Sequence, residues 1–363
     1  MNKMDLRLKG FKCFVDSCIS LNKLTLLTGA NASGKSSVIQ SLLLLRSASG
    51  AKGQQTELNL ENPRYAFDFG NSDSLINNES LSDEVTITIV NGAGIHFSGG
   101  EQQQNRKLCV HVDHLEVLKE TFSRGLNYLC AERQGPRFEH PKTSDGNDFL
   151  DCHGINSGNV ISENWNTKVS GKRLFQAARE ESLFNIALDN WINYMFPGIS
   201  VRIFHVGVQS YQVIVRDKTH NIQTDSTNIG FGISYALPII VAGLLAKEDS
   251  WLVVENPEAH LHAKAQSNMG YFLGIMASAG LRVLVETHSE HVVNGIRRAA
   301  ILSGRLMSDD VNIYFFSGKS ENIMISIDDA GNLSDFPVDF FDQSRQDILE
   351  IIRNSNKNGE DKR

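Results

Sequence analysis

The chain has 363 residues, 41% of them hydrophobic and 21% charged, with a net charge of −7 at pH 7. That length can bury a sizeable core and predicts two domains, or one large domain with insertions. The acidic balance and the lack of a long basic block argue against a nucleic-acid footprint over the whole chain, although folding can still gather a local basic patch.

The five cysteines are odd in number and have no Cys-x-x-Cys spacing, which predicts reduced thiols rather than a disulfide framework or a zinc site. The first residues contain no apolar run typical of a secretion signal. The longest apolar run, 235–246, is too short to span a bilayer and contains a proline. We therefore expect a cytoplasmic protein with no membrane segment.

Short strands are predicted near the start of the chain, followed by a glycine-rich turn and an apolar helix. Residues 82–90 alternate apolar and polar side chains and predict a half-buried strand, paired with 94–97 across an Asn-Gly turn. Residues 99–107 read as a loop and 126–130 as a strand. The expected early strands are 5–8, 18–21 and 24–28.

The second half of the chain changes character. Residues 140–172 are rich in Gly, Asn, Ser and Asp and predict irregular structure, while 174–195 has a helical pattern. From residue 228 helices and strands alternate, which predicts a parallel sheet with right-handed crossovers. The expected elements are strands 201–204 and 211–215, helix 234–247, strand 251–255, helix 259–277, strand 281–286, helix 289–302, strands 311–316 and 323–327, helix 341–353 and a disordered tail, 354–363.

The most informative stretch is 29–37, with the sequence GANASGKSS, which has the Gly-x4-Gly-Lys-Ser spacing of a phosphate-binding P-loop. A chance match in a Gly- and Ser-containing loop is the plain alternative, but the flanking strand and helix favour the functional interpretation. Gly29 and Gly34 permit close backbone approach to an anion. Lys35 is expected to reach the β- and γ-phosphates, and Ser36 to offer its hydroxyl to Mg²⁺.

Three later segments are candidates for the rest of such a site. Glu255 ends an apolar strand and would hold Mg²⁺ in the manner of a Walker B acid; a solvated Glu-Asn-Pro turn is the alternative. His288 follows the next strand, where it could contact the γ-phosphate or be a satisfied structural histidine. A second glycine-rich turn opens a helix and forms another candidate anion site, with Gly230, Gly232 and Ser234.

Together these motifs resemble the ABC-type ATPases of the RecF/SMC-like branch, and among them the OLD-type ATPases of bacteria. Residues 255–262 are similar to the Ile-Glu-Glu-Pro-Glu-Ala-His-Leu-His-Pro wording of that group, and 131–137 and 340–343 look like a subgroup with a short C-terminal domain of unknown function. The resemblance implies an α/β P-loop NTPase fold with an ABC-type head, a mixed central sheet, an N-terminal antiparallel β portion and a helical insertion. It implies a head over 1–305 with an inserted lobe at about 100–200, a small α+β segment over 306–353 and a disordered tail.

The resemblance also implies the ligands and roles. ATP would bind through the P-loop of one subunit and the signature turn of another in a head-to-tail homodimer. Glu255 would coordinate Mg²⁺, and His288 would be the switch histidine. The residues implied to bind ATP are Gly29, Asn31, Ser33, Gly34, Lys35, Ser36, Ser37, Gly230, Gly232 and Ser234.

Some residues depart from the family pattern. The usual second acid after Walker B is Asn256, whose amide cannot act as a general base, so either Glu258 substitutes or hydrolysis is slow and ATP mainly clamps a dimer. Ala32 replaces a common Gly and Tyr235 a frequent Gln. The Glu132-Arg133 cluster could line the nucleotide site or form an ion pair.

A transition-metal site is an alternative for the histidines of this region, but no Cys or acid pair completes a tetrahedral set of ligands with them. These histidines are His260, His262, His288 and His291.

The expected function is an ATP-hydrolysing switch in anti-phage defence with a separate effector, a nuclease or a toxin, because too little chain follows His288 for a Toprim nuclease. The alternatives are a RecF-like DNA-maintenance ATPase that binds DNA itself and, less favoured, the engine of a transporter.

Overall fold

A mixed central sheet lies at the centre of the molecule. The computed structural model describes residues 3–98, 106–142, 150–175, 180–206, 210–217, 221–225, 230–318 and 322–360. Five neighbouring strands run parallel and β20 pairs antiparallel at one edge. The expected parallel arrangement is confirmed. The strand order is β10 (Leu126–Leu129), β17 (Trp251–Glu255), β18 (Arg282–Glu286), β3 (Leu24–Gly29), β19 (Val311–Phe316) and β20 (Asn322–Ile325).

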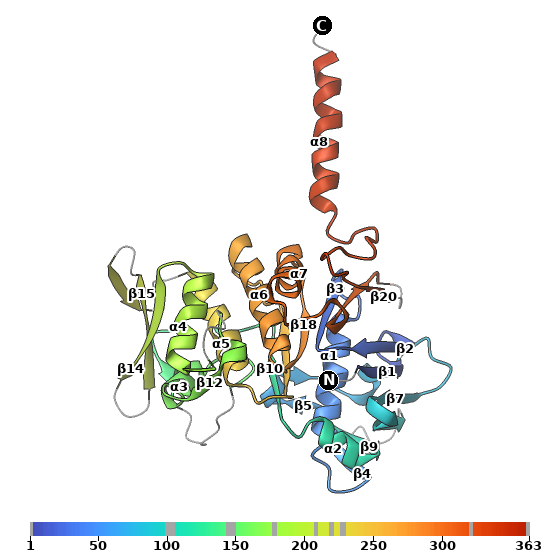
Figure 1. The fold of residues 1–363 in the computed structure, drawn as a ribbon. Coiled ribbons are helices and arrows are strands. Elements are labelled where there is room, and N and C mark those ends of the chain that lie inside the picture. The colour runs from blue at the N-terminus through green and yellow to red at the C-terminus, as the bar shows by residue number, and fades with distance from the viewer. Residues whose placement is uncertain are drawn as a thin grey trace.

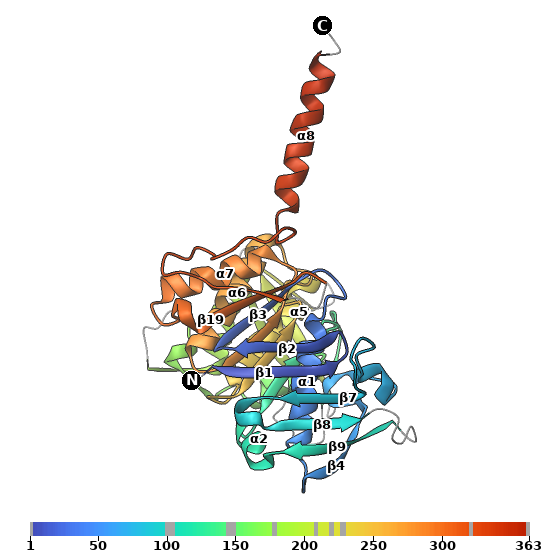
Figure 2. The ribbon, with the colours of Figure 1, turned by 90° about the vertical axis from the view of Figure 1, so that its right-hand side faces the viewer.

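A second, antiparallel sheet lies beside the first, as the stacked blue and cyan strands of Figure 2 show. Helix α1 (Lys35–Ala48) contacts strands of both sheets and buries side chains around most of its circumference. The expected N-terminal antiparallel portion is confirmed, although β9 and β4 were not anticipated, and 99–105 lies outside the described residues. The strand order is β2 (Phe14–Leu21), β1 (Met4–Phe11), β7 (Glu84–Thr88), β8 (Gly94–Ser98), β9 (Lys107–Asp113) and β4 (Gln55–Asn59).

The chain between β10 and β17 forms an inserted lobe, which projects to one side in Figure 1. Strands β14 and β15 pair as expected from the sequence. The lobe contains β11 (His140–Pro141), α3 (Ser157–Glu163), β12 (Lys168–Ser170), β13 (Glu181–Leu183), α4 (Phe184–Met195), β14 (Ile199–Val206), β15 (Ser210–Asp217), β16 (Ile222–Asp225) and α5 (Phe231–Leu245).

Two predictions for this lobe need correction. The segment expected to be irregular contains α3, because Val160 and Ile161 enter the core and outweigh the polar composition around them. The helix expected from residue 174 begins only at Phe184, after β13 has paired with β12. Residues 143–149 and 176–179 lie outside the described residues.

The remaining elements complete the layers. Helices α6 (Ala263–Ser278) and α7 (Glu290–Ser303) pack against each other beside the central sheet, and α2 (Leu115–Thr121) lies beside the antiparallel sheet (Figures 1 and 2). Strands β5 (Glu61–Asn62) and β6 (Phe67–Asp68) form a small ribbon. No helix within the described ranges is long and apolar enough to cross a membrane.

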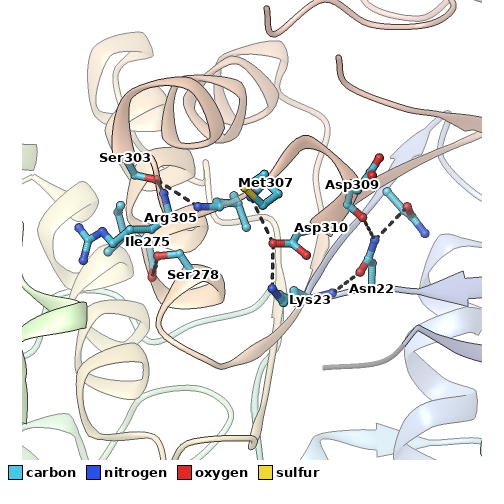
Figure 3. Close-up of polar contacts among 11 residues, drawn as sticks. Asn22, Lys23, Ile275, Ser278, Ser303, Arg305, Met307, Asp309 and Asp310 are labelled. Atoms are coloured by element: carbon cyan, nitrogen blue, oxygen red, sulfur yellow. Dashed lines mark hydrogen bonds and ion pairs between the residues drawn. The ribbon is translucent and has the colours of Figure 1, made fainter. Parts of the chain in front are cut away.

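The C-terminal segment enters the central sheet at the end opposite the P-loop, and β19 then runs to the P-loop end, where Phe316 pairs with Gly29 and residues 338–343 line a cavity with Gly29 and His288. Lys23 Nζ lies 2.9 Å from the Asp310 carboxylate, and the Asn22 side-chain amide donates to the Asp309 carbonyl at 2.6 Å. Figure 3 shows both contacts. Helix α8 (Gln343–Glu360) then projects away from the body (Figures 1 and 2). It extends seven residues into the stretch expected to be a disordered tail, 354–360.

Candidate nucleotide-binding site

The P-loop turn connects β3 to α1 in the way that the sequence predicts. Gly29 and Gly34 have φ of 128° and 107°, and Gly34 caps the helix. A Cβ on Gly29 would lie 2.3 Å from the Phe316 carbonyl oxygen, and one on Gly34 would lie 2.7 Å from the Cys13 sulfur. Both positions therefore require glycine. Ala32 also has a positive φ, 58°, in the left-handed region that favours glycine.

Lys35 faces inward at the start of α1. Its side chain is 3% exposed, and Nζ donates to the carbonyl oxygens of Gly29 at 3.1 Å and Ala30 at 2.5 Å. The pKa of Lys35 is lowered by burial, partly offset by the nearby Glu286 carboxylate. The ammonium is thus held against the loop, with backbone partners that an incoming anion can replace.

A cavity of about 380 Å³ opens above this loop. It brings together the expected P-loop residues and the expected acid and histidine of the neighbouring strands. It also contains Lys12 and Cys13 from the turn between β1 and β2, which the sequence did not point to. The lining residues are Lys12, Cys13, Asn31, Ala32, Ser33, Gly34, Lys35, Ser36, Ser37, Ala131, Glu255, Asn256, Glu286 and His288.

Two carboxylates enter the cavity from adjacent strands, in register at Glu255 and Glu286. Ser36 Oγ donates to both carboxylate oxygens of Glu286, at 3.0 and 3.2 Å. Glu255 instead accepts from the Tyr128 hydroxyl at 2.9 Å. The P-loop serine is therefore bonded to an acid from β18, and the acid on β17 is held from the other side by β10.

The electrostatics of this pair are unfavourable in the absence of a cation. Burial, followed by repulsion from Glu255, raises the pKa of Glu286 to about 7. Burial also raises the pKa of Glu255, opposed by the hydrogen bond from Tyr128. Two carboxylates that share a desolvated pocket favour a positive ion between them.

The turn after β17 is held by contacts with β18. The Asn256 N–H donates to the Glu286 carbonyl at 2.8 Å, and Asn256 has φ of 45°. Glu258 accepts from Thr287 Oγ1 and from the His288 N–H, each at 2.7 Å. Glu258 is not among the residues lining the cavity. Its carboxylate fixes the backbone of His288, which does line the cavity and whose pKa is lowered by burial and then by Lys35.

Arg133 links this turn to the second glycine-rich turn. It is 2% exposed, and its guanidinium donates to four backbone carbonyls instead of forming the ion pair considered from sequence. It also lies 5.4 Å from the Tyr235 ring centroid. These carbonyls belong to Cys130, Glu255, Asn256 and Tyr235. A buried cation therefore couples the end of β17 to the first turn of α5.

The second glycine-rich turn lies apart from the P-loop cavity of the same chain. Gly230 is exposed at the start of α5, and Ser234 lines a small separate cavity with residues of the inserted lobe. A Cβ on Gly232 would lie 2.9 Å from the His260 carbonyl oxygen. Residues 226–229 lie outside the described part of the chain.

Two of the four histidines considered as metal ligands have other partners. The His260 ring packs against Tyr235 and Phe231 at centroid distances of 4.5 and 5.1 Å, and His262 caps α6. Among the described residues, the one group of three close metal-ligand side chains is Cys130, Cys152 and His153, and none of the five cysteines, all of which are described, forms a disulfide bond.

The residues around the cavity fit a magnesium–triphosphate. The Ser33 hydroxyl is buried and, among the residues that the structure describes, has no hydrogen-bond partner; the same holds for the Asn256 Oδ1 atom. The unpartnered Ser33 hydroxyl, together with a lysine and helix N–H groups, can donate to an anion with several oxygens, whereas Asn256 Oδ1 is an acceptor that suits a water or a cation. The hard carboxylate and hydroxyl oxygens of Glu255, Glu286 and Ser36 suit Mg²⁺.

Sequence reasoning missed Glu286 and Tyr128 as parts of this site. Glu286 offered a signal, since it ends a buried strand immediately before Thr287-His288. Tyr128 gave none that separated it from core residues, because its partner lies 127 positions away. Arg133 was a candidate from the sequence, but its carbonyl partners were not foreseen.

Comparisons with known proteins agree with this geometry. A family model described as "AAA domain, putative AbiEii toxin, Type IV TA system" matches residues 24–105 and 93–294. A model described as "Protein of unknown function (DUF3696)" matches residues 306–351. The comparison with curated proteins finds no match.

Solved structures give a fold-level likeness. The Smc head domain of Pyrococcus furiosus, with an extended coiled coil and bound to the C-terminal domain of ScpA, has a TM-score of 0.53 and 12% identity, covering 97% of this chain and 99% of that chain. The SMC head domain of Thermotoga maritima has a TM-score of 0.45 and 15% identity, covering 90% of this chain and 100% of that chain. The Pyrococcus likeness supports the expected ABC-type head fold.

Proposed function

This chain belongs to the AAA-domain family whose model covers residues 24–294, and we propose that it is an ATP-binding and ATP-hydrolysing switch of the OLD-type class that controls a separate effector, a nuclease or a toxin, in defence against phage. The family description, which names a toxin of a toxin–antitoxin system, is compatible with defence. We place the ATPase head at 1–305, its inserted lobe at about 100–200, and a small C-terminal segment at 306–353.

The observation that carries the nucleotide assignment is the convergence of P-loop donors and two acids on one cavity. The N–H groups of the loop and the Lys35 ammonium would take the phosphate oxygens, and the unpartnered Ser33 hydroxyl would gain a bond. Asn31 and Ser37 complete the loop side of the cavity. Bound Mg²⁺ would neutralise phosphate charge as a Lewis acid.

The residues around the γ-phosphate position set the rate. Glu255 and His288 line the cavity and can orient an attacking water, and Glu258 acts as a positioning residue by bonding the His288 backbone. Asn256 occupies the place of the usual base and has no carboxylate to accept a proton. Turnover is therefore slow, and bound ATP acts mainly as a clamp.

The clamp requires a second copy of the chain. Gly230, Gly232 and Ser234 do not line the cavity that contains Lys35 in their own subunit. In a head-to-tail dimer the helix start at Gly230 would face the partner's triphosphate, so that each ATP bridges two subunits. Arg133 then links the P-loop cavity to the second glycine-rich turn within one chain, because it bonds both the end of β17 and α5.

Sedimentation and ATP turnover, with and without DNA, test this proposal. ATP with Mg²⁺ shifts the wild type from monomer to dimer, and Ser234→Arg abolishes the shift while leaving ATP binding intact. A wild type that stays monomeric at saturating ATP contradicts the clamp. Salt-dependent stimulation of turnover by DNA in the absence of a partner protein would favour the RecF-like alternative instead.

A further inference from the structure

Glu286 lies closer to the P-loop than Glu255 does in the order of the sheet. Strand β18 lies between β17 and β3, and Glu286 is in register with Leu27 on β3 and with Glu255 on β17. Adjacent strands are about 4.8 Å apart, so Glu255 starts one strand spacing farther from the loop. The two acids therefore lie at different distances from the P-loop.

The side-chain contacts follow the same order. Ser36, the hydroxyl expected to bind Mg²⁺, donates to both oxygens of Glu286, whereas the Glu255 carboxylate is bonded to Tyr128 on the far side. Glu286 is 6% exposed and yet lines the cavity. Glu286 is a buried acid in contact with the Ser36 hydroxyl, which follows the phosphate-binding Lys35, and this position suits a ligand of a bound cation.

A separate observation points to a ligand at this place. Ser33 is 7% exposed, lines the same cavity and has an Oγ atom for which the described part of the chain supplies no partner. The Lys35 ammonium is hydrogen-bonded to two backbone carbonyls and acts on Glu286 only through space, where it partly offsets the raised pKa of that acid. A cation bound beside Glu286 would add to this partial compensation.

We propose that Glu286, together with Ser36, holds the divalent cation that accompanies the triphosphate, and that Glu255 remains bonded to Tyr128 behind it. The inference rests on the proposed function, in which this cavity takes a nucleoside triphosphate. It reassigns the closest metal carboxylate from the end of β17 to the end of β18. Glu255, whose carboxylate is held by Tyr128, then keeps the water-orienting role proposed above and does not contact the metal.

The test measures metal binding directly, with Mn²⁺ as the probe and a non-hydrolysable ATP analogue. Free Mn²⁺ is counted by electron paramagnetic resonance for wild type, Glu286→Gln, Glu255→Gln and the control Glu290→Gln, an exposed acid in the first turn of α7. Glu286→Gln weakens Mn²⁺ about tenfold or more, Glu255→Gln less than roughly threefold, and Glu290→Gln not at all. Glu286→Asp, which retains a carboxylate, recovers part of the loss.

Two readouts separate the possible failures. Binding of a fluorescent ATP analogue in EDTA establishes that each variant is folded and takes nucleotide; Glu286→Gln retains it. If Glu255→Gln loses Mn²⁺ and Glu286→Gln keeps it, the reassignment is overturned while the ATP site stands. If the wild type binds no nucleotide in any condition, the proposed function itself fails.

Discussion

At the amino end of the central sheet, where β3 and β19 begin, polar side chains are paired with one another. Lys23 meets Asp310, the Asn22 amide donates to the Asp309 carbonyl, and the Asn312 amide donates to the Ser20 carbonyl at 2.7 Å. At the carboxyl end of the same sheet, Glu255 on β17 repels Glu286 on β18, and the Ser33 hydroxyl has no hydrogen-bond partner among the described residues.

The comparison shows which contacts of the sheet stabilise the fold and which groups are left for a ligand. Both ends belong to the same sheet, and β3 contributes to each. Opposite charges and satisfied amides hold the C-terminal segment to the sheet at one end. Like charges and an unsatisfied hydroxyl at the other end are tolerated because a ligand can complete them.

The largest effect is expected from Arg133, the cation that holds the carboxyl end together. Arg133→Met removes the guanidinium donor from the carbonyls of Cys130, Glu255, Asn256 and Tyr235 and lowers the free energy of unfolding by about 3 kcal/mol. Chemical denaturation measures the change. Arg124→Met, on an exposed arginine before β10, is the control and stays within experimental error. Equal stability of the two variants would contradict the role given to Arg133.

Lys35→Ala separates binding from stability at the same end. The substitution removes the ammonium from the phosphate position and weakens ATP binding about 100-fold, as fluorescence titration measures, a loss of about 2.7 kcal/mol. The melting temperature of the nucleotide-free protein changes little, because Gly29 and Ala30, whose carbonyls Lys35 bonds, line a neighbouring cavity of about 310 Å³ that water can enter. Unchanged ATP affinity would contradict the assignment of this cavity as the nucleotide site.

Because Glu255 and Glu286 are paired, the free energy of unfolding is expected to fall as the pH rises. Because the pKa of Glu286 is about 7 in the folded protein and 4.5 ordinarily, the folded state binds its proton more tightly. The associated stability is present below pH 4.5 and is lost as the pH rises through 7. In EDTA, the wild type therefore loses about 2 to 3 kcal/mol relative to Glu286→Gln between pH 5 and pH 8. A constant difference in unfolding free energy would show that Glu286 stays ionised throughout.

The smallest effect is expected at the amino end. A double-mutant cycle on Lys23 and Asp310 gives a coupling energy of about 1 kcal/mol or less, because both side chains keep contact with water. ATP affinity is the same in all four proteins of the cycle. A change in affinity comparable to that of Lys35→Ala would mean that the two ends are not independent.

Sequence patterns predicted the parts of the molecule that depend on neighbouring residues. The P-loop, the strands ending at Glu255 and Glu286 and the helices after them follow from local periodicity and glycine placement. The contact between Ser36 and Glu286 could not be predicted, because it depends on β18 lying between β17 and β3. The bonds of Arg133 depend in the same way on three distant segments. The short helix α3 was missed because its core contacts lie outside its own polar sequence.

Hydrogen–deuterium exchange with and without MgATP tests the central claim most directly, because it observes both ends of the sheet in one experiment. The account predicts slower exchange on ATP addition in peptides covering 29–37 and 284–290, and unchanged exchange in peptides covering 20–24 and 307–312. Protection confined to the amino end, or no protection at 29–37 at saturating MgATP, would contradict it.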